Sequence, residues 1–287
     1  MTAFVQTSEA EWFRPYKTKI ALISWFRYIA AMFKVITFNA NGIRSAARKG
    51  FYDWVLKQNA DVICLQETRA QMQNIHDEIF YPEGYFSFFS NPLKKGYSGV
   101  GIYCKRKPDN LVTELGFELA DEEGRYLQVD FGKLSIASIY IPSGTSGEAR
   151  QALKMHFLKE YTEILRRQLA EKRQFIICGD VNIVHKEIDI KNWKSNQKNS
   201  GCLPEERAWL DLIFEQVGWV DAFRVVNKKP DQYTWWSHFG RAYERNVGWR
   251  IDYQIVSSNL KNKIKSAEIY KEQKFSDHAP VIIQYEL

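Results

Sequence analysis

Carboxylate and amide side chains follow directly after several apolar runs of this sequence. The stretch QFIICGDVNIVHKEID, residues 174–189, begins like a buried strand and passes through Gly179 to Asp180 and Asn182. Asp and Asn near a glycine are common turn residues, because their side chains bond nearby backbone groups. They are also common active-site residues at strand ends of α/β proteins. This stretch alone is compatible with both interpretations.

Polar residues occupy the same kind of position along the whole chain. ITFNANG ends in Asn39 and Asn41, ICLQETR ends in Glu67, WRIDYQIV carries Asp252, and FSDHAPV places Asp277 and His278 before the last apolar run. A turn explains one such strand end. Five of them, rich in carboxylates and amides and including a histidine, indicate an active site.

The chemistry that these residue types favour is metal-assisted attack on a phosphodiester. Oxygen ligands without a Cys/His cluster suit a hard cation such as Mg²⁺. A phosphodiester needs such a cation to neutralise developing charge, a base to align water, and a donor that faces the phosphoryl oxygens. Asp, Glu, Asn and His can supply all three functions.

Other chemistries lack their sequence signals. GYSGVG misses the G-x-S-x-G nucleophile motif by one position, and neither a G-x-x-x-x-G-K-[ST] loop nor a G-x-G-x-x-G fingerprint occurs. No Cys-x-x-Cys pair is present, which disfavours a zinc site or a disulfide framework and favours a reducing compartment. The four cysteines are Cys64, Cys104, Cys178 and Cys202.

The composition and periodicity predict one compact α/β domain. The chain has 287 residues, of which 45% are hydrophobic and 26% charged, and a net charge of +6 that is compatible with a polyanionic partner. Short β-rich runs alternate with amphipathic helices. Strands are expected at 34–39, 62–66, 99–105, 125–131, 134–140, 174–178, 233–237, 249–257 and 279–285, and helices at 48–58, 148–171 and 204–217.

The N-terminal segment does not fit this pattern. Its apolar run IALISWFRYIAAM is too short to span a bilayer and is interrupted by Arg27. A signal peptide is one interpretation. We expect instead that residues 1–31 are an N-terminal extension, either a non-native start or a poorly ordered appendage, and that residues 32–287 form the catalytic domain.

Several motifs, in this order and spacing, are similar to those of a known family. They are FNANGIRS, LQETR, GYSGVGIY, YIPSG, GDVNIVHKEIDIKN, LPEERAWLD, NVGWRIDY and SDHAPV. The chain resembles the exonuclease III class of abasic-site endonucleases, within the endonuclease/exonuclease/phosphatase superfamily, over residues 32–287. The resemblance implies a four-layer α/β sandwich, in which two facing β-sheets are flanked by helices.

The resemblance also implies a role for each strand-end residue. Mg²⁺, with Mn²⁺ as a substitute, would be held by Glu67, Asn41 and Asp277. Asp180 would orient or deprotonate the attacking water, and Asn182 would hold that water or the phosphate. His278, steadied by Asp252, would face the phosphate, Asn39 would support the cluster, and Tyr140 would contact the phosphate or help the leaving oxygen depart.

The substrate implied by the resemblance is double-stranded DNA with abasic sites or blocked 3′ ends. Arg44, Lys49, Asn196 and Asn199 would contact the DNA backbone, and Trp235, Trp249 and Ile251 would form an apolar pocket for a baseless sugar. The implied reaction is cleavage 5′ to the abasic site in base excision repair, with accompanying 3′-5′ exonuclease and 3′-phosphodiesterase activity. We expect a cytoplasmic monomer that acts on nucleoid DNA and has no membrane partner.

The spacing of two of these residues makes a prediction about the backbone. Trp249 and Asp252 are three positions apart, so their side chains would face opposite sides of a regular strand. Both can reach the site only if the chain bends or bulges near residues 248–251, where a glycine is present.

Two rival interpretations use the same strand ends. A superfamily phosphatase acting on inositol phosphates or sphingomyelin would share the catalytic residues but should lack the NVGWRIDY pocket and the basic NQKN loop, both of which are present. A non-catalytic DNA-binding relative would need a broken metal site, whereas every expected ligand is present.

The expected domain boundary can be tested by truncation. A chain that starts at Met32 should keep its activity and its melting temperature nearly unchanged, because residues 1–31 lie outside the expected domain. Thermal unfolding of both chains is the measurement. A drop of many degrees would show that the IALISWF segment packs on the core.

Overall fold

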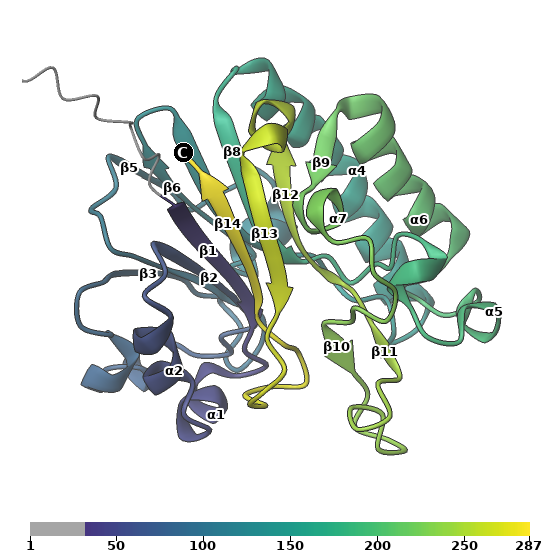
Figure 1. The fold of residues 1–287 in the computed structure, drawn as a ribbon, viewed down its shortest axis with the longest axis horizontal. Helices are drawn as coiled ribbons and strands as arrows, with labels where there is room; N and C mark the ends of the chain where they lie inside the picture. The colour runs from purple at the N-terminus through teal and green to yellow at the C-terminus, as the bar shows by residue number, and fades with distance from the viewer. Residues whose placement is uncertain (1–31) are drawn as a thin grey trace, which may run out of the picture. The chain divides into compact units, whose positions relative to one another are not determined.

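The computed structural model describes residues 32–287, so our expectation for residues 1–31 lies outside the described part. Two β-sheets of six strands each face one another, and helices cover their outer faces (Figure 1). The predicted four-layer α/β sandwich is therefore confirmed. No helix within residues 32–287 is long and apolar enough to cross a membrane.

Both sheets are mixed. The first has the order β13 (Ile264–Ile269), β14 (Val281–Glu286), β1 (Met32–Asn39), β2 (Val62–Gln66), β4 (Val100–Cys104), β3 (Phe86–Ser90). The second has the order β5 (Asn110–Val112), β6 (Tyr126–Phe131), β7 (Leu134–Tyr140), β8 (Gln174–Asp180), β12 (Asp252–Ser257), β9 (Trp219–Asp221). A separate two-stranded ribbon pairs β10 (Trp235–Trp236) with β11 (Gly248–Trp249).

The helices lie outside the sheets. The two helices that follow β1 pack on the first sheet, and the long helix after β7 and the helix at 204–211 after β8 pack on the second. Their bounds are α1 Ile43–Arg48, α2 Phe51–Gln58, α3 Glu118–Glu122, α4 Glu148–Ala170, α5 Trp193–Asn196, α6 Pro204–Asp211 and α7 Ala222–Val226.

Three apolar clusters explain why the sequences of the central strands are apolar throughout. Val35 and Val62 of the first sheet meet Ile176 of the second in the core between the sheets. The opposite face of the first sheet packs against α2, and that of the second sheet packs against α4, which contributes Leu158 and Leu165. Central strands are thus buried on both faces, which removes the polar alternation of a half-exposed strand.

Two parallel strand pairs bring the polar strand ends together. β1 runs parallel to β2, with Asn39 opposite Gln66, and β7 runs parallel to β8, with Tyr140 opposite Asp180. β12 is antiparallel to β8 and begins with Asp252 opposite Asp180. Because the carboxyl ends of parallel strands meet at one edge, the residues after four separate runs converge there.

The element boundaries differ from the expected ones at identifiable places. The single strand expected at 249–257 is two strands, β11 and β12, separated by two residues, so the expected bend is confirmed. The helix expected at 48–58 is α1 followed by α2, because Gly50 has a φ of 82° and interrupts the helical path. The helix expected at 204–217 ends as α6, and residues 212–217 form a wider π-helical turn.

A fully buried ion pair joins two helices to a loop beside the site. Lys154 of α4 lies 2.7 Å from Glu206 of α6, and its ammonium group also donates to the Asn182 carbonyl at 2.8 Å. The other oxygen of Glu206 accepts the backbone N–H groups of Gly201 and Leu203 at 2.6 and 3.0 Å. One pair of charges therefore positions both the loop and the backbone of Asn182.

This ion pair should behave as one unit when it is mutated. Lys154→Met or Glu206→Gln alone should lower the free energy of unfolding by about 3–5 kcal/mol, because each leaves a buried charge unpaired. The double variant should cost less than the sum of the two, by about 1–3 kcal/mol. Urea unfolding measures all three values, and strictly additive costs would contradict the expectation.

Candidate active site

A cavity of about 720 Å³ lies at the edge where β1, β2, β7 and β8 end. Polar residues from all four strand ends and from the segment before β14 line it. They are Asn41, Glu67, Tyr140, Asp180, Asn182, Asp277 and His278. The sequence predicted every one of these residues as part of a site, and the structure brings them together.

Asn39 is the fully buried centre of this group. Its amide nitrogen donates to Glu67 Oε1 at 3.0 Å and to Asp180 Oδ2 at 2.8 Å. Its amide oxygen accepts the backbone N–H of Asn41 at 2.9 Å. Glu67 follows a strand of the first sheet and Asp180 ends a strand of the second, so a single amide links carboxylates from both sheets.

Three residues of the group have left-handed backbone conformations. The φ angles are 42° for Asn41, 47° for Glu67 and 55° for Asn182. Asn tolerates this region, whereas it costs free energy for Glu, and such strain concentrates at functional sites. The conformation of Glu67 is held by hydrogen bonds from Gly42 N to its carbonyl at 2.8 Å and from Thr68 N to Gly99 O at 3.0 Å.

Asn182 and Asp180 form a compact turn after β8. The backbone N–H of Asn182 donates to Asp180 Oδ1 at 2.9 Å, and its side-chain amide donates to Asp180 Oδ2 at 3.2 Å and to Ile141 O at 3.0 Å. The turn interpretation and the active-site interpretation of this stretch therefore describe the same geometry, because the turn aims both side chains into the cavity.

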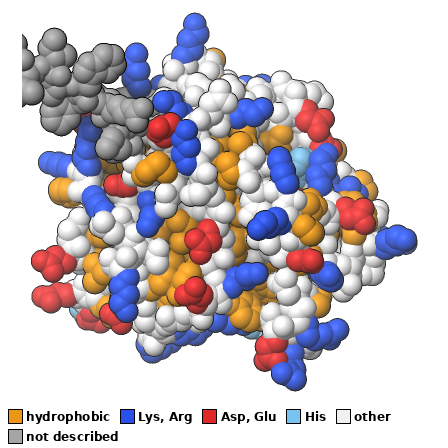
Figure 2. Space-filling view, in the orientation of Figure 1, with side chains coloured by type: hydrophobic (Ala, Val, Ile, Leu, Met, Phe, Trp, Pro, Cys, Tyr) orange, Lys and Arg blue, Asp and Glu red, His pale blue; other side chains and the backbone are white. Residues whose placement is uncertain are grey.

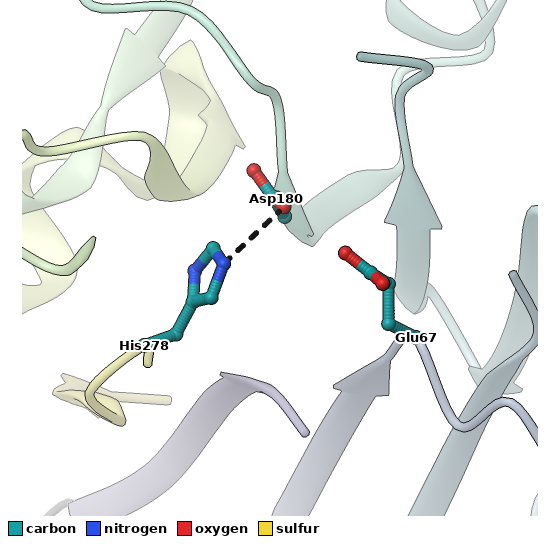
Figure 3. A group of neighbouring side chains, drawn as sticks. All are labelled: Glu67, Asp180 and His278. Atoms are coloured by element: carbon teal, nitrogen blue, oxygen red, sulfur yellow. Dashed lines mark ion pairs between the residues drawn. The ribbon is translucent and has the colours of Figure 1, made fainter. Parts of the chain in front are cut away.

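His278 lies between two carboxylates. Its Nδ1 is 2.9 Å from Asp252 Oδ2, and its Nε2 is 3.9 Å from Asp180 Oδ2. Figure 3 shows the side chains of Glu67, Asp180 and His278 pointing toward one another. Asp252 does not line the cavity and holds the imidazole from behind.

Burial and neighbouring charges shift the pKa values of this pair strongly. Burial raises the pKa of Asp180 to about 8, with Asp252 and Glu67 adding to the shift and His278 opposing it. Burial lowers the pKa of His278, but the charges of Asp252, Asp180 and Asp277 outweigh it and raise the pKa to about 10. Without a further cation, protons therefore reside on this pair at neutral pH.

The donor set fits a hard metal ion. Ligand atoms of Glu67, Asp180 and His278 all lie within 4.8 Å of one another. Four carboxyl groups belong to the cluster, those of Glu67, Asp180, Asp252 and Asp277, and Arg69, His278 and His238 lie within ion-pair distance of them. A bound cation would let Asp180 ionise beside the other carboxylates, and carboxylate oxygens are the ligands that hard divalent cations prefer.

The two further residues that were expected to hold the metal are hydrogen-bonded to each other. Asn41 and Asp277, which were expected to hold the metal with Glu67, lie in the same cavity, where Asn41 Nδ2 donates to Asp277 Oδ1 at 2.7 Å. Burial raises the pKa of Asp277, but His278 and hydrogen bonds from Asn41, Ser276 and Trp235 lower it to about 2. The carboxyl group of Asp277 is therefore ionised at neutral pH.

Tyr140 is a neutral phenol at the cavity wall. Burial, together with the charges of Glu67 and Asp180, raises its pKa well above the usual value of 10. The guanidinium of Arg125 lies 4.7 Å from the centre of its ring. The ring therefore lies near one cation and near the carboxyl groups of Glu67 and Asp180.

An apolar wall adjoins the carboxylates. Trp235, Trp249 and Ile251 line the same cavity, and the two indoles meet edge to face at 5.9 Å and 85°. Trp235 Nε1 also donates to Asp277 Oδ2 at 3.2 Å. Gly201, with a φ of 92°, leaves room for the Trp249 ring. A Cβ at this position would lie 3.0 Å from both that ring and the Asn182 carbonyl.

The four residues expected to contact DNA do not all reach the cavity. Asn199 lines it and donates to Asn196 Oδ1 at 2.9 Å, so these two amides form one polar surface at the end of α5. Arg44 and Lys49 are exposed on and just after α1 and do not line the cavity. Any contact that they make with a ligand has to lie outside it.

Sequence reasoning gave no role to two side chains that contact the carboxylates. Arg69 donates through Nε to Glu67 Oε2 at 2.8 Å and forms an ion pair with it. His238 Nε2 lies 3.6 Å from Asp277 Oδ2. Arg69 belongs to the motif LQETR, and this position could have indicated a role in the site. His238 belongs to a loop of irregular sequence, where no periodicity indicates which residues it contacts.

Comparison with known proteins places this geometry in a family. A model of the endonuclease/exonuclease/phosphatase family matches residues 36–278. The exodeoxyribonuclease of Bacillus subtilis strain 168 is 37% identical over 252 residues, which cover 86% of this chain and 97% of that protein. A DNA-(apurinic or apyrimidinic site) endonuclease of Dictyostelium discoideum is 36% identical over 257 residues, which cover 88% of this chain and 71% of that protein.

A solved structure agrees with these sequence matches. An AP endonuclease from Archaeoglobus fulgidus superposes with a TM-score of 0.81 at 25% identity, over 89% of this chain and 100% of that one. The similarity thus extends through both sheets and the cavity-forming strand ends.

The metal site can be tested without any substrate. Glu67→Gln should weaken Mn²⁺ binding by about tenfold or more, because it removes a carboxylate charge while keeping the side-chain shape. Titration calorimetry measures the affinity, and Asp53→Asn, at an exposed carboxylate of α2, is the matched control. Equal affinity of the Glu67 variant and the control would rule out Glu67 as a main ligand.

Proposed function

The chain belongs to the endonuclease/exonuclease/phosphatase family, and from this membership we propose that it is a metal-dependent DNA-repair phosphodiesterase that cleaves the backbone 5′ to abasic sites. Accompanying 3′-5′ exonuclease and 3′-phosphodiesterase activities are part of the proposal. One observation carries it. A buried carboxylate cluster and an indole-lined apolar wall face the same cavity.

The metal is proposed to be Mg²⁺, with Mn²⁺ as a substitute. Glu67 would hold it, with Asn41 and Asp277 contributing directly or through water. When bound, such a cation neutralises charge on the phosphate oxygens and lowers the pKa of nearby acids. The buried group of Glu67, Asp180 and His278 supports this assignment, because its ligand atoms lie within 4.8 Å of one another and a bound cation would stabilise the ionised form of the buried carboxyl groups.

The reaction then follows from the positions of the side chains. Asp180 accepts the proton of the attacking water, which Asn182 helps to hold, and the water oxygen bonds to phosphorus. His278, kept in place by Asp252, donates to a phosphoryl oxygen. The bond to the 3′ oxygen breaks, and this oxygen takes up a proton from solvent water and becomes a hydroxyl. Tyr140, a neutral phenol because its pKa is raised, contacts the phosphate or helps that oxygen depart by donating a hydrogen bond to it.

Substrate selection is proposed to rest on the apolar wall. Trp235, Trp249 and Ile251 would accept a flipped sugar without a base, and a normal nucleotide would not fit. A missing base also makes flipping less costly. Asn196 and Asn199, with Arg44 and Lys49 outside the cavity, would contact the backbone of double-stranded DNA.

The overall charge adds little to this proposal. Lysine and arginine side chains are distributed over the visible face of the molecule among acidic ones (Figure 2). The support for DNA as the partner is therefore the cavity and the relatives, rather than the net charge of +6. A cytoplasmic monomer remains our expectation, and the four cysteines, all buried and unpaired, are consistent with a reducing compartment.

One assay tests the proposed function. A duplex with a single abasic analogue should be cut with Mg²⁺ and left intact with EDTA, and an otherwise identical intact duplex should not be cut internally. Asp180→Asn should lower the cleavage rate about 10²- to 10⁴-fold, as expected for loss of a general base, while affinity for abasic DNA changes little.

The assay has a control variant and two results that would contradict the expectation. Asp53→Asn, which removes an exposed carboxylate, should cut at the wild-type rate. Internal cleavage of the intact duplex at the same rate as the abasic duplex would overturn the proposal. Parallel loss of binding and turnover in the Asp180 variant would assign Asp180 a structural role.

A further inference from the structure

The segment that carries Trp249 and Ile251 of the apolar wall pairs with a second segment around Ile190, and neighbouring side chains in both segments lie on opposite sides. Trp249 and Ile251 face the cavity, and Ile190 packs in the same apolar cluster. Ile190 also forms a β-bridge with Trp249. Asp189 and Arg250, their neighbours in sequence, are buried and do not line the cavity.

Arg250 forms a buried ionic centre behind this wall. Its Nε lies 2.7 Å from Asp189 Oδ1, and its Nη2 lies 2.6 Å from Asp221 Oδ2. The guanidinium is 4.4 Å from the centre of the Tyr253 ring. The side chain is 1% exposed, so every one of these contacts lies out of water.

Backbone hydrogen bonds join the same two segments. Arg250 N donates to Asp189 O at 2.7 Å, and Lys191 N donates to Gly248 O at 3.0 Å. Asp189 is therefore bound to Arg250 through both its carbonyl and its carboxylate. The two residues are 61 positions apart, and their contact determines where Ile190, Trp249 and Ile251 lie relative to one another.

A general stabilising role is a weak explanation for such a centre. Removing two charges from water costs free energy that their attraction often does not exceed, so a buried ion pair is weak evidence for a gain in stability. Arg250 also lies in the break between β11 and β12, where its backbone N–H bonds to Asp189 O instead of to a partner strand of either sheet. The ion pairs of its side chain add a second connection to Asp189 and a connection to Asp221 at this break.

We propose that Arg250 is a positioning residue, which through Asp189 and Asp221 holds Trp249 and Ile251 at the spacing that selects a baseless sugar. This inference rests on the proposed function, because it concerns the selectivity of the same cavity. It predicts that loss of Arg250 changes the preference between two reactions, rather than lowering both equally.

The chain contains a matched control for this test. Arg224 of α7 binds the same Asp189 oxygen, through Nε at 2.9 Å and Nη2 at 2.7 Å, but it lies outside the wall. Arg250→Met and Arg224→Met each remove one guanidinium from Asp189 and keep an unbranched apolar chain. A general effect on folding should therefore appear in both variants.

The measurement is the ratio of kcat/KM for cleavage at an abasic analogue to kcat/KM for trimming of an intact recessed 3′ end. Arg250→Met should lower this ratio on the order of 10- to 100-fold, the effect expected when a substrate-positioning group shifts by about 1 Å. Arg224→Met should keep the wild-type ratio. Circular dichroism at the assay temperature verifies that each variant is folded.

A second variant keeps the test decisive if Arg250→Met does not fold. Arg250→Met combined with Asp221→Asn removes the carboxylate charge that the single change would leave buried and unpaired. This double variant should show the same fall in the ratio. A wild-type ratio in the folded double variant would overturn the inference, as would an equal fall in Arg224→Met.

Trp249→Ala separates failure of this inference from failure of the proposed function. If Trp249→Ala lowers the ratio and the Arg250 variants do not, the pocket stands and the positioning role of Arg250 is wrong. If Trp249→Ala leaves the ratio unchanged, Trp249 is not the selector, Trp235 becomes the better candidate, and the positioning role of Arg250 is wrong. The proposed function would then still stand or fall on its own comparison of abasic and intact duplexes.

Discussion

The side-chain amide of Asn39 joins the two sheets at the point where their strand ends meet. Its nitrogen donates to Glu67 and Asp180, which belong to different sheets, and its oxygen accepts the N–H of Asn41. An amide suits this position because it donates two hydrogen bonds without adding charge to a crowded carboxylate cluster. Hydrogen bonds to this one buried group therefore hold Glu67 and Asp180 close to each other.

Two features around Asn39 are energetically unfavourable, and an ordinary strand end would not contain them. Glu67 has a left-handed backbone, and buried carboxylates gather within a few ångströms of one another. Hydrogen bonds from Arg69 and Asn39 and the imidazole of His278 offset part of this cost. Such strained and charged arrangements persist only where the surrounding fold is rigid, and here both sheets are packed on both faces.

The apolar wall depends on an interruption of regular structure. β11 ends at Trp249 and β12 begins at Asp252, so the chain can present Trp249 to the cavity and Asp252 to His278. The ribbon of β10 and β11 brings Trp235 opposite Trp249, and Gly201 leaves room for the indole. The strand-end carboxylates and this break are therefore two neighbouring but separate features of the same cavity.

The sequence by itself determined the central strands, the polar residues that end them and the family. Runs such as VICLQ and LSIASIY are apolar throughout because both faces are buried, and their expected bounds agree with β2 and β7. The short edge strands β5 and β9, of three residues each, were not predicted, because so few residues show no periodicity.

Only the tertiary structure decided which side chains meet. The motifs that contain Asp189 and Arg250 do not reveal that these two residues form an ion pair, and His238 carried no signal of its contact with Asp277. Spacing along the chain reports the face of one element, whereas these pairs join elements that are far apart in sequence or lie in irregular loops. Their contacts depend on strand register and on the break before β12, neither of which local sequence patterns encode.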